Sequence, residues 1–146
     1  MILLACLIGH ILCERKCTES ETLAHLRQEL NHNNLAGYII PSEDAHLSEY
    51  VAPEYRRRQY MTGLAGSAGI AIVIGTKALV STDSRYCIQA DVQVYCNWDI
   101  HCPGSEVDAI EYIIANSNSG DVIGANPFLF TPTTWSSYSN GLAAHG

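Results

Sequence analysis

The segment Gly66-Ser67-Ala68-Gly69 places a serine among glycines, an arrangement in which a serine can act as a nucleophile. A nucleophile elbow requires the order G-x-S-x-G, and Ala65 stands where its first glycine belongs. The elbow also needs a strand before the serine and a helix after it, whereas the hydrophobic pattern here predicts the reverse. No Lys-Ser/Thr pair follows the glycines, so a phosphate-binding loop is not indicated either. We therefore expect a close-packed turn, with no catalytic role for its serine.

Two groups of residues have side chains that bind metals. His46 and Glu49 stand three residues apart, which can bring an imidazole beside a carboxylate, but no third ligand follows at a familiar spacing. The group of Cys96, His101 and Cys102 lacks the second ligand pair of a zinc site. Neither group predicts a metal centre, and we expect His46 to be a loop residue with local hydrogen bonds.

Charged residues occur in two further patterns. Asp83 and Arg85 flank Ser84 at the end of a predicted strand, which predicts a tight turn held by the Asp83 carboxylate and an ion pair with the arginine. Residues 56–58 are three consecutive arginines, and long charged side chains are seldom buried. We therefore interpret the arginine run as the solvated face of a short helix.

Apolar residues at helical spacing predict three longer helices. The first begins with a capping box from Thr18 to Glu21, and the second is capped by Ser105. The third has Thr131 as its cap and Pro132 as its first residue, a position that suits proline. These helices are expected at residues 18–30, 105–114 and 131–142, with shorter ones at 47–50 and 56–61.

Short apolar runs bounded by turn residues predict strands at 36–40, 70–74, 78–81, 98–101 and 121–125. The second and third of these flank Gly75-Thr76-Lys77 and are expected to form a β-hairpin. Residues 86–94 fit more than one structure by periodicity alone. Because strands alternate with helices, we expect a layered α/β domain.

The composition limits the class of protein. The chain has 146 residues, which is enough for one domain with a hydrophobic core and too few for two. Lysine and arginine number 8 against 15 aspartates and glutamates, so the formal net charge is -7. This acidic balance argues against nucleic-acid binding, which needs a clustered basic face.

Residues 1–13 form an apolar stretch that ends abruptly at Glu14-Arg15-Lys16. The stretch is too short to span a bilayer, which takes about 20 residues. It suits the hydrophobic region of a secretory signal peptide cut near Cys13, and the alternative is an apolar segment that docks on the domain. We therefore expect secretion, with a cytoplasmic location as the alternative.

The cysteine pattern depends on that choice. Removal of residues 1–13 leaves Cys17, Cys87, Cys96 and Cys102, and four cysteines allow three connectivities. Cys96 and Cys102 flank a predicted strand, so a local disulfide between them is the pairing that we consider first. Cys87 stands in an apolar run and is interpreted as a small buried hydrophobic residue.

Six segments, taken in chain order, resemble the N-terminal domain of aminopeptidase P, an X-prolyl aminopeptidase of the creatinase superfamily. They are GYIIPS at 37–42, DAHLSEYV at 44–51, the arginines 56–58 with TGLAGSAG at 62–69, TDSRY at 82–86 with IQA at 88–90, NW at 97–98, and IGANP at 123–127 followed by Trp135. Together they extend over roughly residues 22–142. The chain departs from the family pattern at Ser84, Cys87 and Asn126, where glycine, an aromatic residue and aspartate are usual.

The resemblance implies a mixed β-sheet flanked by helices, the ribonuclease H-like fold of this domain, at residues 18–146. It also implies that a later pita-bread domain, absent from this chain, carries two manganese or zinc ions and cleaves peptides with proline at position two. No catalytic or metal-binding residue is therefore assigned in this chain, and no cofactor.

The same resemblance implies a scaffold that caps the mouth of the active site, limits substrate length and contributes to a homodimer. The polar residues expected nearest to that mouth are His46, Tyr50, Arg57 and Arg85. An arginine there can bind a peptide carboxylate or carbonyl through charge-assisted hydrogen bonds. The alternative is a free-standing, secreted, non-catalytic binding module with the same fold.

Overall fold

The structure, a computed structural model, describes residues 20–102 and 109–145. The proposed signal peptide (1–13), Thr18 and Ser105 lie outside the described residues. Helix α1 (Glu21–His32) is capped by Ser20, whose Oγ accepts a hydrogen bond from the backbone N–H of Leu23 at 3.4 Å. The predicted cap at Thr18 is therefore wrong, because the helix begins two residues after the capping box requires.

The other elements follow the predicted alternation of strands and helices. They are β1 (Gly37–Pro41), α2 (Arg57–Thr62), β2 (Ile70–Ile74), β3 (Lys77–Ser81), α3 (Cys87–Gln93), β4 (Asp99–His101), α4 (Ala109–Asn116), β5 (Ile123–Ala125) and α5 (Pro132–Ala143), with 3-10 turns at Pro53–Tyr55, Ser84–Tyr86 and Pro127–Leu129. Helix α5 has the predicted cap, since the Oγ1 of Thr131 accepts from the N–H of Thr134 at 3.1 Å. The short helix predicted at 47–50 is absent, and that stretch is irregular, with a bend at residues 49–50.

The five strands form one sheet in the order β4-β3-β2-β1-β5. Strand β2 pairs antiparallel with β1 and β3, whereas β5 runs parallel to β1 and β4 runs parallel to β3. The predicted mixed sheet is thus confirmed. The hairpin at 70–81 is confirmed too, with Gly75 in its turn at a φ of 53°, which favours glycine.

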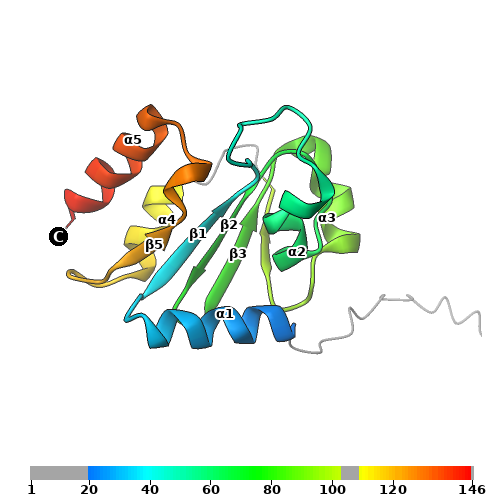
Figure 1. Cartoon of the computed structure of the whole chain (residues 1–146). Helices are drawn as coiled ribbons and strands as arrows, with labels where there is room; N and C mark the ends of the chain where they lie inside the picture. Colours follow the sequence, from blue (N-terminus) through cyan, green and yellow to red (C-terminus); the bar gives the residue numbers. More distant parts are fainter. Residues whose placement is uncertain (1–19, 103–108, 146) are drawn as a thin grey trace, which may run out of the picture.

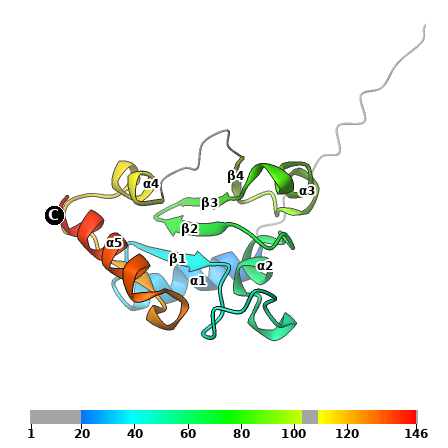
Figure 2. The same cartoon turned by 90° about the horizontal axis from the view of Figure 1, so that it is seen from above.

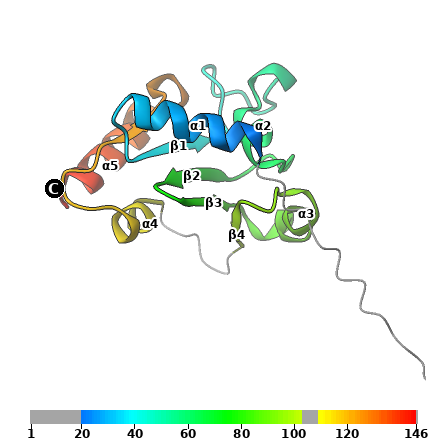
Figure 3. The same cartoon turned by 90° about the horizontal axis from the view of Figure 1, so that it is seen from below.

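Helices cover both faces of the sheet. Helices α1, α2 and α3 lie below and to the right of the sheet in Figure 1, and α4 and α5 lie to its upper left. Seen from below, α1 runs across the first of these faces (Figure 3), and seen from above, α4 and α5 stand together near one end of the strands (Figure 2). Two buried faces explain why β1, β2 and β3 read as nearly continuous apolar runs.

Alternate residues of the strands belong to two separate apolar clusters, one on each face of the sheet. On the α1–α3 face, Leu23 and Leu30 of α1 pack in one cluster with Val73 of β2 and Val80 of β3, all at most 5% exposed. On the opposite face, Ile113 of α4 packs in a cluster that contains the neighbouring isoleucines of β1 and β2: Ile39, Ile72 and Ile74. This period of two is the one that a strand imposes on its side chains.

Cys87 and Cys102 form a disulfide bond, with a Cα–Cα distance of 5.6 Å. The pairing of Cys96 with Cys102 that we considered first is therefore wrong, and Cys87 is not simply a buried hydrophobic residue. The reason is the parallel pairing of β4 with β3, which places His101 opposite Ser81. Cys102 directly follows β4 and Cys87 begins α3 after the turn that follows β3, whereas Cys96 precedes β4 at its other end.

Candidate functional site

Three loops meet at one end of the sheet because of the antiparallel pairing in its centre. Pro41 at the end of β1 lies opposite Ile70 at the start of β2, which in turn lies opposite Ser81 at the end of β3. The loop after β1, the glycine-rich turn before β2 and the turn after β3 therefore adjoin one another. We call these three loops, residues 42–52, 63–69 and 82–86, the polar edge.

Arg58 holds two of these loops together. Its side chain is 4% exposed, and its Nε donates to the Oγ of Ser42 at 2.8 Å. Its Nη1 donates to the carbonyl of Leu64 at 3.3 Å, and its Nη2 donates to the carbonyl of Gly66. Burial lowers the pKa of the Arg58 guanidinium, and the negative charge of Glu43 opposes that effect. Among the residues that the structure describes, no carboxylate forms an ion pair with Arg58.

The interpretation of residues 56–58 as one solvated face is thus wrong at its last member. Arg58, Met61 and Thr62 are the buried residues of α2, at the spacing i, i+3 and i+4 that lines one face of a helix. The spacing of three residues between Arg58 and the apolar Met61 could have indicated that Arg58 is buried. We overlooked it because Arg58 belongs to a run of three arginines, which we interpreted together as exposed. The prediction holds for Arg56, which is exposed.

The Ser67 hydroxyl lies 2.6 Å from the Tyr86 hydroxyl. This hydrogen bond lowers the pKa of the Tyr86 phenol, because it stabilises the phenolate. Gly66 lies flat against the same ring, where an added Cβ would approach the Tyr86 Cγ within 2.7 Å. The glycines therefore form the close-packed turn that the sequence predicted, with Ser67 bound to a tyrosine.

The predicted turn after β3 is confirmed. The Oδ1 of Asp83 accepts from the backbone N–H of Arg85 at 2.9 Å, and the Arg85 Nη2 forms an ion pair with Oδ2 at 2.5 Å. The Arg85 guanidinium also lies 5.3 Å from the centre of the Tyr86 ring. The hydrogen bond from Arg85 lowers the pKa of Asp83. The Arg85 guanidinium is therefore held in one direction by Asp83. It also remains open to solvent, because the Arg85 side chain is 69% exposed.

The loop after β1 is organised by Asp44, a residue that was not among the predicted site residues. Its carboxylate is 2% exposed and accepts from the backbone N–H groups of His46 at 2.9 Å and Ser48 at 3.0 Å. The Ser48 hydrogen bond is the main cause that lowers the pKa of Asp44. The two candidates on this loop, His46 and Tyr50, are both exposed, Tyr50 by 86%.

The structure places three of the four candidate residues on the polar edge and the fourth elsewhere. His46 and Tyr50 stand on its first loop and Arg85 on its last, and Tyr50 lines a hollow of about 160 Å³ with Arg58. Arg57 instead lines an apolar hollow of about 490 Å³ beside Met61. Its guanidinium lies 5.6 Å from the centre of the Tyr55 ring.

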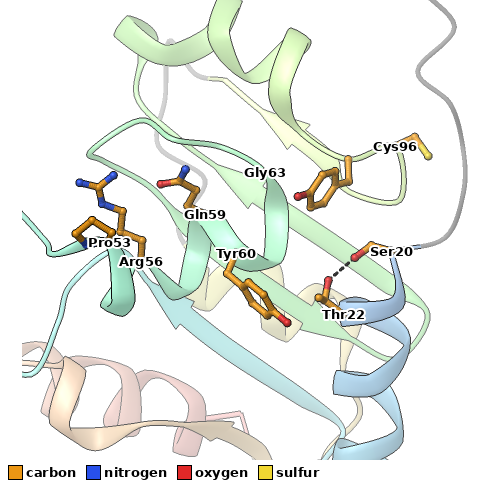
Figure 4. Close-up of a pocket in the computed structure, with 9 residues that line it drawn as sticks. Ser20, Thr22, Pro53, Arg56, Gln59, Tyr60, Gly63 and Cys96 are labelled. Atoms are coloured by element: carbon orange, nitrogen blue, oxygen red, sulfur yellow. Dashed lines mark hydrogen bonds between the residues drawn. The ribbon is translucent and has the colours of Figure 1, made fainter.

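A larger hollow of about 560 Å³ lies between the start of α1, helix α2 and the residues that follow α3 (Figure 4). Ser20, Thr22 and Cys96 lie toward one side of it in Figure 4, with Pro53 and Arg56 toward the other. Gln59 also lines it, and its buried Oε1 has no hydrogen-bond partner among the described residues. Sequence patterns gave no signal for this hollow, because it is formed by segments far apart in the chain.

Two further properties of the described residues bear on function. Within residues 20–102 and 109–145, no three histidine, cysteine, aspartate or glutamate side chains come together as metal ligands. None of the helices in these two ranges has the length and apolar character needed to cross a membrane.

The creatinase/prolidase N-terminal domain family matches residues 23–145, and the chain belongs to this family. It is 44% identical over 120 residues to Xaa-Pro aminopeptidase 2 of Rattus norvegicus. This match covers 82% of this chain and 18% of the rat protein. It is 42% identical over 129 residues to the probable Xaa-Pro aminopeptidase P of Aspergillus niger, covering 87% of this chain and 21% of that protein. The chain thus spans about a fifth of the length of these relatives.

Solved structures agree with the fold. One of them is the X-prolyl aminopeptidase of Caenorhabditis elegans, which is described as a cytosolic enzyme with a di-nuclear active site. It superposes on this chain with a TM-score of 0.80 at 32% sequence identity, and the match covers 86% of this chain and 22% of the Caenorhabditis elegans chain. The N-terminal domain of the peptidase PepQ of Mycobacterium tuberculosis gives a TM-score of 0.61 at 18% identity, over 86% and 87% of the two chains. The predicted fold and family are both confirmed.

Proposed function

We propose that this chain is the N-terminal, non-catalytic domain of an Xaa-Pro aminopeptidase. The observation that carries the proposal is the identity of 41–44% to mammalian proteins described as Xaa-Pro aminopeptidase 2, over more than four fifths of this chain. The matched part is only 18% of those proteins. On this proposal the substrates of the whole enzyme are peptides with proline at position two.

The catalytic centre belongs, on this proposal, to a further domain that holds two manganese or zinc ions. The di-nuclear active site described for the Caenorhabditis elegans enzyme supports a two-metal centre in the family. Such a pair of ions supplies an activated water and stabilises the developing oxyanion. Domain boundaries follow from the same proposal, with a signal peptide at 1–13 and this domain at 18–146.

The polar edge is the part of the domain that we assign to the mouth of the active site. Arg85 supports this assignment, because its exposed guanidinium is already oriented by Asp83 and needs little reordering to bind a peptide carbonyl or carboxylate. Tyr50 supports it as well, since its exposed ring stands over the hollow that reaches Arg58. Both side chains would limit the length of peptide that enters.

Dimerisation and secretion are the two remaining parts of the proposal. Ile88 and Val92 stand one helical turn apart on α3 and are 84% and 79% exposed, which makes them the candidate contact of a homodimer.

The disulfide between Cys87 and Cys102 favours an oxidising compartment and hence secretion. The Caenorhabditis elegans enzyme is described as cytosolic, which fits the cytoplasmic alternative.

A chimera tests the role of the polar edge. Residues 18–146 replace the matching segment of rat Xaa-Pro aminopeptidase 2, and kcat and KM are measured for X-Pro peptides of increasing length. We expect an active chimera, in which Arg85→Ala and Tyr50→Ala raise KM or relax the length limit while kcat changes little.

Thr76→Ala is the matched control, because Thr76 is exposed in the β2–β3 turn at the opposite end of the sheet. The gating role is refuted if the two edge variants and the control have the same KM at every peptide length. An inactive chimera that is folded and retains its metals would refute the assignment to this enzyme class.

A further inference from the structure

The hollow of about 160 Å³ on the polar edge is lined by a buried cation that has spare hydrogen-bond donors. This cation is Arg58, whose side chain is 4% exposed. A guanidinium has five N–H groups, and Arg58 has three acceptors among the described residues, which are the Ser42 hydroxyl and the carbonyls of Leu64 and Gly66. The other two N–H groups are therefore left for a group that enters the hollow.

A second arginine lines the same hollow. Arg56 is exposed, and its Nε is fixed by a hydrogen bond to the carbonyl of Val51 at 3.0 Å. Glu49 lines the hollow as well, but no carboxylate of the described residues forms an ion pair with Arg56 or Arg58. A buried charge without a counter-ion is costly, so charge-assisted hydrogen bonds would favour an anion in this hollow.

Gln59 adds a group that needs a hydrogen-bond donor. It lines the same hollow, and its Oε1 is buried without a partner among the described residues. Figure 4 shows the side chains of Arg56 and Gln59 extending in the same direction, away from Tyr60. Because the torsion of a terminal amide is soft, a small rotation presents the oxygen to a ligand. An N–H on the ligand would then satisfy this oxygen, whose unpaired burial costs free energy.

We propose that this hollow binds the C-terminal residue of a peptide, with its carboxylate on Arg56 and Arg58 and its backbone N–H on the Oε1 of Gln59. The volume corresponds to about five water molecules, so a small residue such as glycine fits. The need for an N–H separates a peptide end from a simple carboxylate. This inference concerns binding by the domain itself, and it rests neither on peptide cleavage nor on the role proposed for Arg85.

Three small probes separate these contacts in the full chain. N-acetylglycine has both the carboxylate and the N–H, acetate lacks the N–H, and N-acetylglycinamide lacks the carboxylate. The backbone amide signals of Gly66 and Ser67, which line the hollow, are followed by NMR during titration at constant ionic strength. We expect N-acetylglycine to bind about threefold to tenfold more tightly than acetate, and N-acetylglycinamide to leave the signals unchanged.

Two substitutions assign the contacts, with two controls beside them. Arg56→Gln should weaken the binding of N-acetylglycine and of acetate alike, by about tenfold. Gln59→Met should weaken N-acetylglycine alone, down to the affinity of acetate. Arg57→Gln, the matched control, changes an arginine that lines a different hollow and should alter neither affinity. Arg85→Ala should also alter neither, which separates this site from the proposed mouth of the active site.

The proposal is overturned if N-acetylglycinamide binds as tightly as N-acetylglycine, or if neither carboxylate shifts the two signals. It is also overturned if Arg56→Gln and Arg57→Gln weaken binding equally. Equal affinities for acetate and N-acetylglycine would refute the assignment to a peptide end.

Discussion

The Nε of Arg58 lies 2.8 Å from the Oγ of Ser42, so a side chain of α2 is bonded to the first residue after β1. The same guanidinium donates to the carbonyls of Leu64 and Gly66, on the turn that leads into β2. One buried cation therefore fixes two of the three loops of the polar edge. A loop held in this way can present Tyr50 and His46 in a defined position.

Replacing Arg58 should destabilise the domain more than replacing its neighbour. Arg58→Ala leaves two buried carbonyls and the Ser42 hydroxyl without their donor, and we expect a loss of about 3 kcal/mol in the free energy of unfolding. Arg58→Lys should recover only part of it, because an ammonium cannot reproduce the planar fork. Urea denaturation measures all three values.

Arg56→Ala is the matched control for this prediction. Arg56 is exposed and its Nε donates to the carbonyl of Val51 at 3.0 Å, so its loss should cost at most about 1 kcal/mol. Equal destabilisation by Arg56→Ala and Arg58→Ala would contradict the role that we assign to the buried guanidinium.

The hydrogen bond between Ser67 and Tyr86 predicts a change in titration. Ser67→Ala removes the main cause that lowers the Tyr86 pKa, so this pKa should rise toward its ordinary value of 10.0. The Cζ resonance of Tyr86, followed by NMR against pH, measures the shift. Thr76→Ala, at the opposite end of the sheet, should leave it unchanged. A Tyr86 titration that is the same with and without Ser67 would show that the bond is not formed in solution.

Asp44 predicts a loss of stability in acid. Its pKa is lowered below the ordinary value of 3.8 when the chain folds, so the folded state binds the proton less readily than the unfolded state. The stabilisation is fully present above pH 3.8 and is lost as the pH falls through the lower, folded pKa. Asp44→Asn should therefore be less stable at neutral pH and should show a weaker decline on acidification.

Thermal unfolding, followed from about pH 2.5 to about pH 7, would measure this difference on both sides of the ordinary carboxyl pKa of 3.8. Asp91→Asn, an exposed substitution on α3, is the control and should follow the parent curve. If Asp44→Asn also follows the parent curve, the carboxylate does not stabilise the loop as its hydrogen bonds indicate.

Local features of this fold were predictable from the sequence. The helix cap at Thr131, the hairpin turn at Gly75 and the ion pair of Asp83 with Arg85 each depend on residues a few positions apart. Interactions of this kind can be predicted because both partners are close together in the sequence. The same holds for the continuous apolar run of β2, which is typical of a strand buried on both faces.

Long-range relationships were not predictable in the same way. The bond between Cys87 and Cys102 follows from the parallel pairing of β3 with β4, and sequence spacing alone favoured a nearer partner. Arg58 was missed because the rule that arginines stay exposed fails where backbone carbonyls satisfy the guanidinium. Arg57, chosen in its place, points to a different hollow because adjacent residues of a helix face different directions.

The central proposal is that this chain is a domain which depends on a further, metal-binding domain for cleavage of X-Pro bonds. The most direct test is the rate at which the purified chain releases the first residue of an X-Pro peptide in the presence of Mn²⁺, measured beside the rat chimera. We predict no release above the buffer blank by the chain alone, and release by the chimera that a chelator abolishes. Release by the chain alone, abolished by the chelator, would contradict the proposal.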